Sequence, residues 1–352
     1  MDHRLIRACR RQSVDVTPVW FMRQAGRFLP EYRKIRETHD IISICKNPEL
    51  CAKVTTLPVE ILGVDAAIMF ADIMLPIEGM GVRFEIQEGV GPIIKQPISD
   101  LRSAASLETL DPASDVPFVL EAIGITRKML DAKVPLIGFC GAPFTIASYL
   151  IEGRPTRDFI KVKTLMYRDP KAWHALMGKL SDSMARYLRS QVNAGVELVQ
   201  LFDSWVGCLS PQDYHNYVLP YSQRIFKELE DTGVPRIHFG TGTASLLEEM
   251  KAAGGDVFGV DWRIPLDVAW ERLGDDVGIQ GNLDPATLLG DMELVKSASM
   301  DILRRAGGRR GHIFNLGHGM LPDALPENVA ALVKFVHDTT SNSASQHPTQ
   351  PR

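Results

Sequence analysis

Two arginines, Arg23 and Arg27, stand four residues apart in the segment FMRQAGRFLPEYR, residues 21–33. An amphipathic helix would carry leucine or alanine on this face and would not include Gly26. If the segment lies over the mouth of a binding pocket, the two guanidinium groups face a partly desolvated space, where an unpaired charge is costly. A ligand carboxylate or phosphate is therefore the expected partner, because both groups accept charge-assisted hydrogen bonds from arginine.

The residues between the two arginines are Gln24, Ala25 and Gly26. They offer small side chains and backbone N–H groups, which can form a concave nest for an anion. Salt bridges from the arginines to Glu31 or to a more distant acid are the alternative. The segment thus predicts an anion-binding loop, with a structural cluster of ion pairs as the competing interpretation.

Five further polar residues follow other predicted strands and could take part in chemistry. They are Asp72, Tyr149, Asp203, Ser204 and His318. Each also has a structural interpretation, since Asp72 and Ser204 are of residue types that cap helices. A histidine between two glycines can stabilise a turn by a hydrogen bond, and a single tyrosine is more often a core residue.

Other chemistries lack their motifs. No GxGxxG leads from a strand into a helix and no GxxxxGK[ST] occurs, although HFGTGT at 238–243 could cradle a phosphate. GxSxG is absent, and no cysteine has an obvious histidine partner. His238, His312 and His318 lack close companions of the kinds that bind zinc. We therefore expect neither a metal nor an organic cofactor.

Eight short apolar runs, each followed by polar or glycine residues and then by a helical pattern, predict the elements that must position these residues. They are PVWFM (18–22), VDAAIMF (64–70), VPLIGFC (134–140), VELVQLF (196–202), PRIHF (235–239), DVFGV (256–260), VGIQG (277–281) and HIFNL (312–316). Eight βα units favour an α/β fold, a single (β/α)8 barrel of the TIM type. Its active site would lie at the carboxyl ends of the strands.

Two segments, GVDAAIMFAD at 63–72 and GVELVQLFDS at 195–204, resemble each other. Each predicts a glycine helix cap, a buried parallel strand and a polar residue beyond the strand. The residues near 82–98 predict an inserted β-hairpin with a Gly-Val-Gly turn. The barrel domain is expected to span residues 1–338, and the polar tail, 339–352, is expected to be disordered.

The composition narrows the class of protein. With 39 Lys and Arg against 43 Asp and Glu among 352 residues, the net charge of −4 argues against non-specific nucleic-acid binding. The odd number of cysteines, five, without a CxxC pair, favours free thiols. The amino terminus lacks the apolar core of a signal peptide, and no run approaches eighteen apolar residues. We expect a cytoplasmic enzyme that does not enter a membrane.

Several motifs together resemble one known family, uroporphyrinogen decarboxylase. They are PVWFMRQAGRFLPEYR (18–33), FADI (70–73), GAPFT (141–145), YLIEG (149–153), GNLDP (281–285) and LGHG (316–319). The resemblance extends from about residue 3 to 338. It implies a single distorted (β/α)8 barrel, a homodimer and catalysis without metal or organic cofactor. The implied reaction of haem biosynthesis converts the four acetate side chains of uroporphyrinogen III to methyls, giving coproporphyrinogen III and four CO₂.

The resemblance also implies roles for individual residues. The loop from Arg23 to Arg27, with Gln24, Ala25 and Gly26, would bind substrate carboxylates, and Asp72 would face the macrocycle. Tyr149, Ser204 and His318 would make further substrate contacts. Many members of the family have Lys-Gly after the fifth strand, whereas this chain has Thr241-Gly242 and so no lysine to contribute there.

Two rival functions give different expectations. A zinc-dependent methyltransferase with the same barrel would need a His-x-Cys pair and a further cysteine, but the chain has His238-Phe239-Gly240 and Leu316-Gly317-His318 at those places. A tetrapyrrole carrier would keep the two arginines without needing Asp72. The sequence leaves open the proton donor, the isomer preferred, the order of the four decarboxylations and any need for the dimer.

Overall fold

The computed structural model describes residues 3–87 and 89–341. The chain divides into two compact units, each assembled from separate segments. The first unit comprises Met1–Phe70, Ile125–Ile137 and Asp256–Arg352, and the second comprises Ala71–Gly124 and Gly138–Gly255. Helix α8 (Pro117–Leu130) and strand β4 (Leu136–Gly141) contain the points at which the chain passes from one unit to the other.

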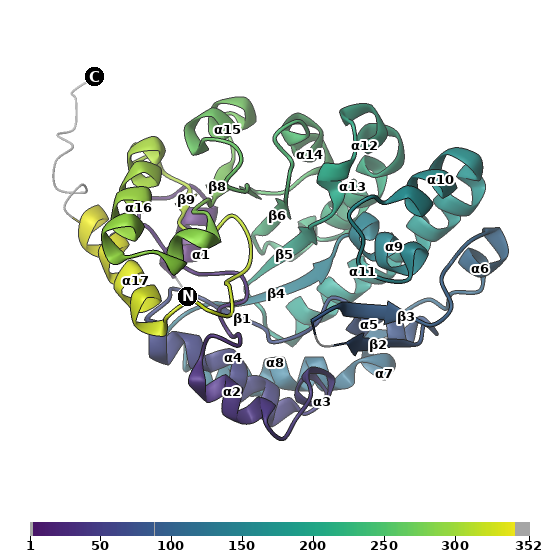
Figure 1. The fold of residues 1–352 in the computed structure, drawn as a ribbon, viewed down its shortest axis with the longest axis horizontal. Helices are drawn as coiled ribbons and strands as arrows, with labels where there is room; N and C mark the ends of the chain where they lie inside the picture. Colours follow the sequence, from purple (N-terminus) through teal and green to yellow (C-terminus); the bar gives the residue numbers. More distant parts are fainter. Residues whose placement is uncertain (1–2, 88, 342–352) are drawn as a thin grey trace. The chain divides into compact units, whose positions relative to one another are not determined.

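The first unit alternates short parallel strands with helices. Its remaining elements are α1 (Arg4–Cys9), α2 (Pro30–Arg36), α3 (Ile41–Cys45), α4 (Pro48–Leu62), β1 (Ala67–Ile68), β7 (Val257–Gly259), α15 (Leu266–Leu273), β8 (Gly278–Gln280), the 3-10 helix η3 (Pro285–Leu289), α16 (Met292–Ala306), β9 (His312–Ile313) and α17 (Pro326–Ser341). Strand β1 pairs in parallel with β4, and β8 pairs in parallel with both β7 and β9. Helix α17 packs against α4 and α16 (Figure 1).

The second unit contains the longest helix and the hairpin. Its remaining elements are α5 (Leu75–Gly79), β2 (Phe84–Gln87), β3 (Gly91–Ile94), α6 (Leu101–Ala105), α7 (Pro112–Asp115), α9 (Pro143–Glu152), α10 (Ile160–Arg168), α11 (Pro170–Ala194), β5 (Leu198–Asp203), η1 (Val206–Cys208), α12 (Pro211–Tyr217), α13 (Leu219–Glu228), η2 (Glu230–Thr232), β6 (Arg236–Gly240) and α14 (Leu247–Ala253). Strands β5 and β6 are parallel, with Leu201 opposite His238.

The inserted hairpin predicted near 82–98 is confirmed. Strands β2 and β3 are antiparallel, and Phe84 pairs with Ile94 while Gln87 pairs with Gly91. The hairpin leads to the end of α9, where the N–H of Ile94 donates to the carbonyl of Gly153 at 2.8 Å. This contact anchors the helix that carries Tyr149.

The predicted fold class is also confirmed. Seven strands follow one another in the order β1-β4-β5-β6-β7-β8-β9, which agrees with a parallel α/β sheet of the TIM type. Both predicted glycine caps end helices, because Gly63 follows α4 in the left-handed conformation and Gly195 follows α11. The expectation of one domain over residues 1–338 stays a prediction.

The first of the eight predicted strands is reduced to a single parallel bridge between Val19 and Phe314. Proline has no N–H to donate, so Pro18 contributes only its carbonyl, which accepts from Phe314. The N–H of Val19 donates to the carboxylate of Asp65 at 2.7 Å instead of to a strand. The ladder is therefore short, and the chain enters a turn directly afterwards.

Helix boundaries differ from the sequence pattern in two places. The helical pattern that follows the first apolar run is divided between α2 and α3, because the side chain of Asp40 caps α3 by accepting from the N–H of Ser43. Helix α17 continues to Ser341, so residues 339–341 of the predicted tail are helical. Residues 342–352, the rest of that tail, lie outside the described residues.

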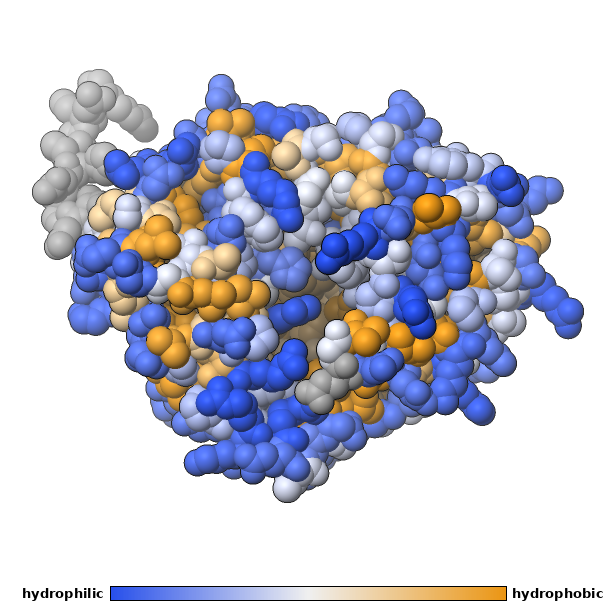
Figure 2. All heavy atoms as spheres, in the orientation of Figure 1, coloured by the Kyte–Doolittle hydropathy of each residue, from blue (hydrophilic) through white to orange (hydrophobic). Residues whose placement is uncertain are grey.

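The surface and the thiols fit the expectations from composition. On the face drawn in Figure 2, hydrophilic residues predominate and hydrophobic ones occur in separate groups. All five cysteines are free, and four of them are buried. Among the described residues, no helix has the length and apolar character that crossing a membrane requires.

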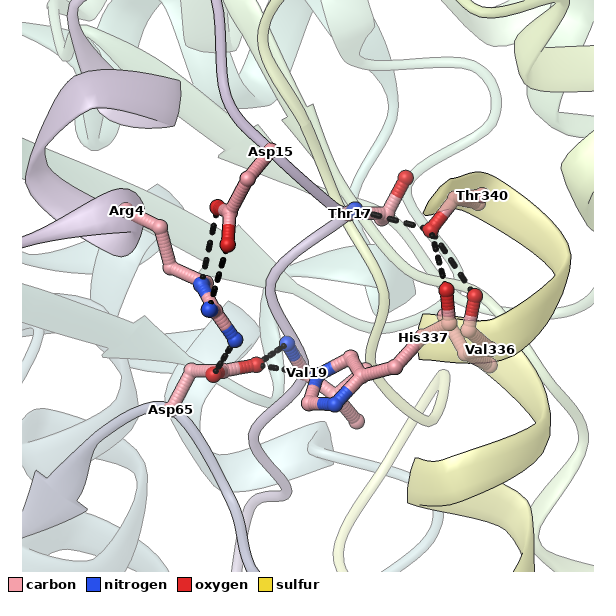
Figure 3. A network of polar contacts seen from close by, with 8 residues as sticks. All are labelled: Arg4, Asp15, Thr17, Val19, Asp65, Val336, His337 and Thr340. Carbon is pink, nitrogen blue, oxygen red and sulfur yellow. Dashed lines mark hydrogen bonds and ion pairs between the residues drawn. The ribbon is translucent and has the colours of Figure 1, made fainter. Parts of the chain in front are cut away.

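A network around Asp65 ties together remote segments of the first unit (Figure 3). The buried carboxylate accepts from the guanidinium of Arg4 at 2.8 Å, the N–H of Val19 at 2.7 Å and the imidazole of His337 at 2.7 Å. Arg4 also pairs with the exposed Asp15. The carboxylate thus joins α1, the segment that carries the bridge at Val19, and α17.

Candidate active site

The arginine-bearing loop of the first unit is a tight turn directly after the bridge at Val19. Arg23 has a φ of +61°, a conformation that few residues other than glycine adopt. At Gly26 a Cβ would lie only 2.8 Å from the carbonyl oxygen of Arg23, so the turn leaves no room for a side chain there. Arg23 and Arg27 are exposed, as a loop that receives a ligand requires.

Gln24 is the internal support of this loop. Its side chain is fully buried, with its oxygen accepting from the N–H of Phe21 and its amide donating to the carbonyl of Ala66. The N–H of Gln24 is bonded to the carbonyl of Phe21. Both polar groups of the side chain are therefore engaged within the protein, and the predicted contact of Gln24 with a ligand has no support from its side chain.

The structure brings Arg23 together with His318, which the sequence separates widely. Burial and the nearby guanidinium groups of Arg23 and Arg263 lower the pKa of His318 to about 4, against the opposing charge of Asp261. His318 is thus neutral at physiological pH. A neutral imidazole can donate or accept one hydrogen bond from a ligand, but it holds no spare proton for acid catalysis.

Glycines on both sides of His318 permit close packing. At Gly319 a Cβ would lie 2.8 Å from Cγ and 2.9 Å from Nε of Arg23. At Gly317 it would lie 2.6 Å from the backbone nitrogen of Trp262. The lack of a side chain at Gly319 therefore makes room for the flexible side chain of Arg23, whereas the lack of one at Gly317 makes room for the backbone of Trp262.

Two charged residues that follow β7, Asp261 and Arg263, were not predicted from the sequence as site residues. The buried carboxylate of Asp261 accepts from the N–H of Arg263 at 2.9 Å and from its guanidinium at 2.6 Å. Arg263 also lies over the ring of Trp262, 4.1 Å from its centroid. The pattern that could have indicated these two residues is Asp-x-Arg directly after the sixth predicted strand.

In the second unit, Asp72 lies half-buried in the turn that leads to α5. Its Oδ1 accepts from the N–H of Met74 at 2.9 Å, and its carbonyl accepts from Leu75. This side-chain bond to the residue two positions on is an Asx turn. The interpretation of Asp72 as a helix cap is wrong for α5, because Met74 is the N-cap residue and no side chain caps that helix.

Tyr149 and Ser204 are held in one neighbourhood of the second unit by Trp205. The rings of Tyr149 and Trp205 meet edge to face with centroids 6.0 Å apart, and Phe159 packs on the same indole at 5.8 Å. Ser204 directly precedes Trp205 at the end of β5. The two predicted contact residues are thus positioned together.

Thr241, the departure from the family pattern, has a structural role. Its hydroxyl donates to the carbonyl of Ser204 at 2.5 Å and so joins the ends of β5 and β6. A Cβ at Gly207 would lie 2.8 Å from the Cα of Gly242, so the backbone of η1 packs tightly on this turn. A small side chain suits this crowded place.

Two of the histidines considered as metal ligands are core residues. His238 and His312 are buried and lie within hydrogen-bonding distance of the carbonyls of Gly254 and Gly281. Within residues 3–87 and 89–341 no group of three or more His, Cys, Asp or Glu side chains could hold a metal ion.

The fold and the polar residues after its strands define an α/β enzyme of the TIM-barrel class. A family model described as "Uroporphyrinogen decarboxylase (URO-D)" matches residues 1–339. The chain is 51% identical to the uroporphyrinogen decarboxylase of Carboxydothermus hydrogenoformans, over 98% of the chain and 99% of the relative. It is 52% identical to that of Thermus thermophilus over 96% of the chain and 98% of the relative. The chain belongs to the uroporphyrinogen decarboxylase family.

Solved structures support the fold alone. A methyltransferase from Methanosarcina mazei matches with a TM-score of 0.81 and 22% identity, covering 96% of the chain and 98% of its own. A B12-independent methionine synthase from Shewanella sp. W3-18-1 matches with a TM-score of 0.58 and 11% identity, covering 88% and 92%. The sequence-based prediction of a decarboxylase of haem biosynthesis is confirmed by the family match.

Proposed function

We propose that the chain removes CO₂ from the four acetate side chains of uroporphyrinogen III and so produces coproporphyrinogen III. The observation that carries this proposal is the match to the family model over residues 1–339, with relatives about half identical over nearly their whole length. The exposed arginines of a mildly acidic chain add chemical support, because a macrocycle with eight carboxylates needs fixed cations to bind it.

Arg23 and Arg27 bind substrate carboxylates in this proposal. The planar guanidinium group pairs with carboxylate through two parallel hydrogen bonds, which lysine cannot do. The exposed guanidinium of Arg23, held beside a neutral His318, is available for such a pair. Ala25 and Gly26 act as the small residues of the loop, and Gln24 acts by supporting it.

Asp72 stabilises the positive charge that the substrate acquires during the reaction. Loss of CO₂ from an acetate leaves an electron pair, which ordinarily requires an electron sink. Protonation of a pyrrole carbon beside the acetate-bearing position makes the substrate its own sink, since the cation is conjugated to the breaking bond. A carboxylate that accepts the pyrrole N–H groups favours this cation electrostatically. A second proton then goes to the methylene carbon, and the ring carbon returns the first.

Tyr149, Ser204 and His318 make neutral polar contacts with the macrocycle. The lowered pKa of His318, about 4, leaves it without a proton to give at physiological pH. A polar neutral contact is therefore the better role for this residue. The proposal further includes a homodimer and a cytoplasmic location, both carried over from the family.

The proposal is tested by direct assay. Purified, dialysed protein is incubated anaerobically with uroporphyrinogen III, and products with seven, six, five and four carboxylates are followed over time. We expect stepwise conversion to the four-carboxylate product, unchanged by a chelator. Binding without conversion would favour a carrier, and activity lost with the chelator and restored by zinc would favour metal-dependent chemistry.

Replacing Gly319 by alanine tests the role of Arg23 without removing it. The new Cβ would displace the side chain of Arg23, whereas the backbone at Gly319 has no positive φ to oppose alanine. We expect KM to rise about tenfold, the usual effect of losing one charged contact, with little change in thermal stability.

Two further alanine variants serve as controls for Gly319→Ala. Gly178→Ala on α11 adds a methyl group to open space and should leave KM unchanged. Gly317→Ala forces backbone apart at Trp262 and should lower the unfolding temperature. An unchanged KM in Gly319→Ala would show that the position of Arg23 does not matter to the substrate.

A further inference from the structure

The strongest feature left outside the proposed mechanism is a buried carboxyl group at the end of β5. Asp203 is fully buried, and it is the last residue of the strand. Its Oδ1 accepts from the hydroxyl of Thr145 at 2.9 Å. An acid in such a place is costly, so a purpose beyond packing is expected.

The hydroxyl of Thr145 links this carboxyl to the loop that follows β5. Its oxygen accepts from the N–H of Trp205 at 3.3 Å while its proton goes to Asp203. A hydroxyl has one proton, so while Asp203 is ionised the direction of these hydrogen bonds is fixed: Trp205 donates to Thr145, and Thr145 donates to Asp203. Ser204 stands in the sequence between Asp203 and Trp205, the two residues that are hydrogen-bonded to Thr145.

The same hydroxyl fixes the helix that carries Tyr149. Thr145 and Tyr149 are four residues apart on α9 and therefore share a face of the helix. The ring of Tyr149 then meets Trp205, whose own N–H is bonded to Thr145. Contacts among Asp203, Thr145 and Trp205 thus connect the segment that carries Ser204 to the helix that carries Tyr149.

The second oxygen of Asp203, Oδ2, is buried and has no hydrogen-bond partner within the described part of the chain. Burial raises the pKa of Tyr214, and the nearby charge of Asp203 raises it further. Thr145 favours the ionised carboxylate through hydrogen bonds from its hydroxyl and from its backbone N–H, but burial outweighs both and raises the pKa of Asp203.

We propose that Asp203 is a positioning residue for the decarboxylation, which holds Ser204 and Tyr149 in place through the hydroxyl of Thr145. This inference rests on the proposed function. The hydrogen bond from Thr145 is strongest when the carboxyl is ionised, because a charged acceptor about doubles its strength. Substrate use should therefore improve as the carboxyl loses its proton.

The electrostatic surroundings place this change near neutral pH. Burial raises the pKa of Asp203 to about 7, opposed by the hydrogen bonds from the hydroxyl and the backbone N–H of Thr145. Burial raises the pKa of Cys208 on η1 to about 11, where Lys163 lowers it and Asp203 and Asp213 raise it. The pKa of Tyr214 on α12 also lies well above neutrality, raised further by Asp203 and Glu249. Neither of these two neighbours titrates near pH 7, so neither accounts for a transition there.

The variants Thr145→Val and Asp203→Asn test the inference, because each nearly preserves the volume of the side chain. Thr145→Val removes the hydroxyl, and we expect kcat/KM for uroporphyrinogen III to fall about tenfold, with recovery in Thr145→Ser. Asp203→Asn keeps an acceptor for Thr145 but cannot ionise. In wild type kcat/KM should rise about fivefold as pH passes through 7, and this rise should be absent in Asp203→Asn.

Ser148→Ala is the matched control, because Ser148 is also a buried hydroxyl on α9 but donates to the carbonyl of Phe144 in its own helix. It should leave both kcat/KM and its pH profile unchanged. If Thr145→Val does not fold, the pH profile of Asp203→Asn decides the question. An active wild type with unaltered values in these variants would overturn the inference, whereas an inactive wild type would instead overturn the proposed function.

Discussion

Replacing Asp72 by asparagine is expected to lower kcat by about 100- to 1,000-fold, the usual loss when a group aimed at developing charge is removed. Asparagine keeps the Oδ1 acceptor for the N–H of Met74, so the turn before α5 should survive. The variant therefore separates the charge of Asp72 from its structural bond. Affinity for the substrate should change little, because Arg23 and Arg27 are untouched.

The measurement combines anaerobic turnover with equilibrium binding of the same substrate. Asp100→Asn is a suitable control, because Asp100 also binds a backbone N–H, that of Ser103, at the start of an exposed helix in the same unit. It should retain wild-type kcat. Turnover of Asp72→Asn within threefold of wild type would leave Asp72 with a structural role only, and loss of binding together with turnover would make it a binding group.

Most of the fold follows from the sequence because parallel strands buried on both faces appear as continuous apolar runs. Strands β4, β5 and β6 each end one residue beyond the predicted run. The first run forms only a bridge, since Pro18 has no N–H and Val19 donates to Asp65. That outcome depends on a side chain more than forty residues away, which no local pattern reveals.

The candidate site was less predictable than the strands. The MRQAGR motif indicated an anion-binding turn, but burial of Gln24 depends on the carbonyl of Ala66, and the lowered pKa of His318 depends on Arg23. Hydrogen bonds and pKa values of this kind are set by partners that are distant in sequence. Residue types can therefore indicate which side chains carry chemistry, whereas their protonation states require the structure.

Removing the charge of Asp65 is expected to cost about 3–5 kcal/mol of unfolding free energy, the range seen when one partner of a buried ion pair is lost. Three donors converge on this carboxylate: the guanidinium of Arg4, the N–H of Val19 and the imidazole of His337. In Asp65→Asn an amide N–H₂ group would have to face at least one of these donors. One buried donor would then lack an acceptor, and its desolvation would not be compensated.

The network supplies its own control (Figure 3). Asp15 bonds to the same guanidinium, through Nε at 3.1 Å and Nη2 at 2.6 Å, but its side chain is 62% exposed, against 8% for Asp65. Water can replace the exposed partner, so Asp15→Asn should cost less than about 1 kcal/mol. Both variants are compared with wild type by urea unfolding. Equal losses in the two would mean that burial does not determine the strength of this network. The carboxylate of Asp65 accepts hydrogen bonds from α1, from Val19 and from α17. A large loss confined to Asp65→Asn would therefore show that this buried carboxylate stabilises the fold by joining the three segments.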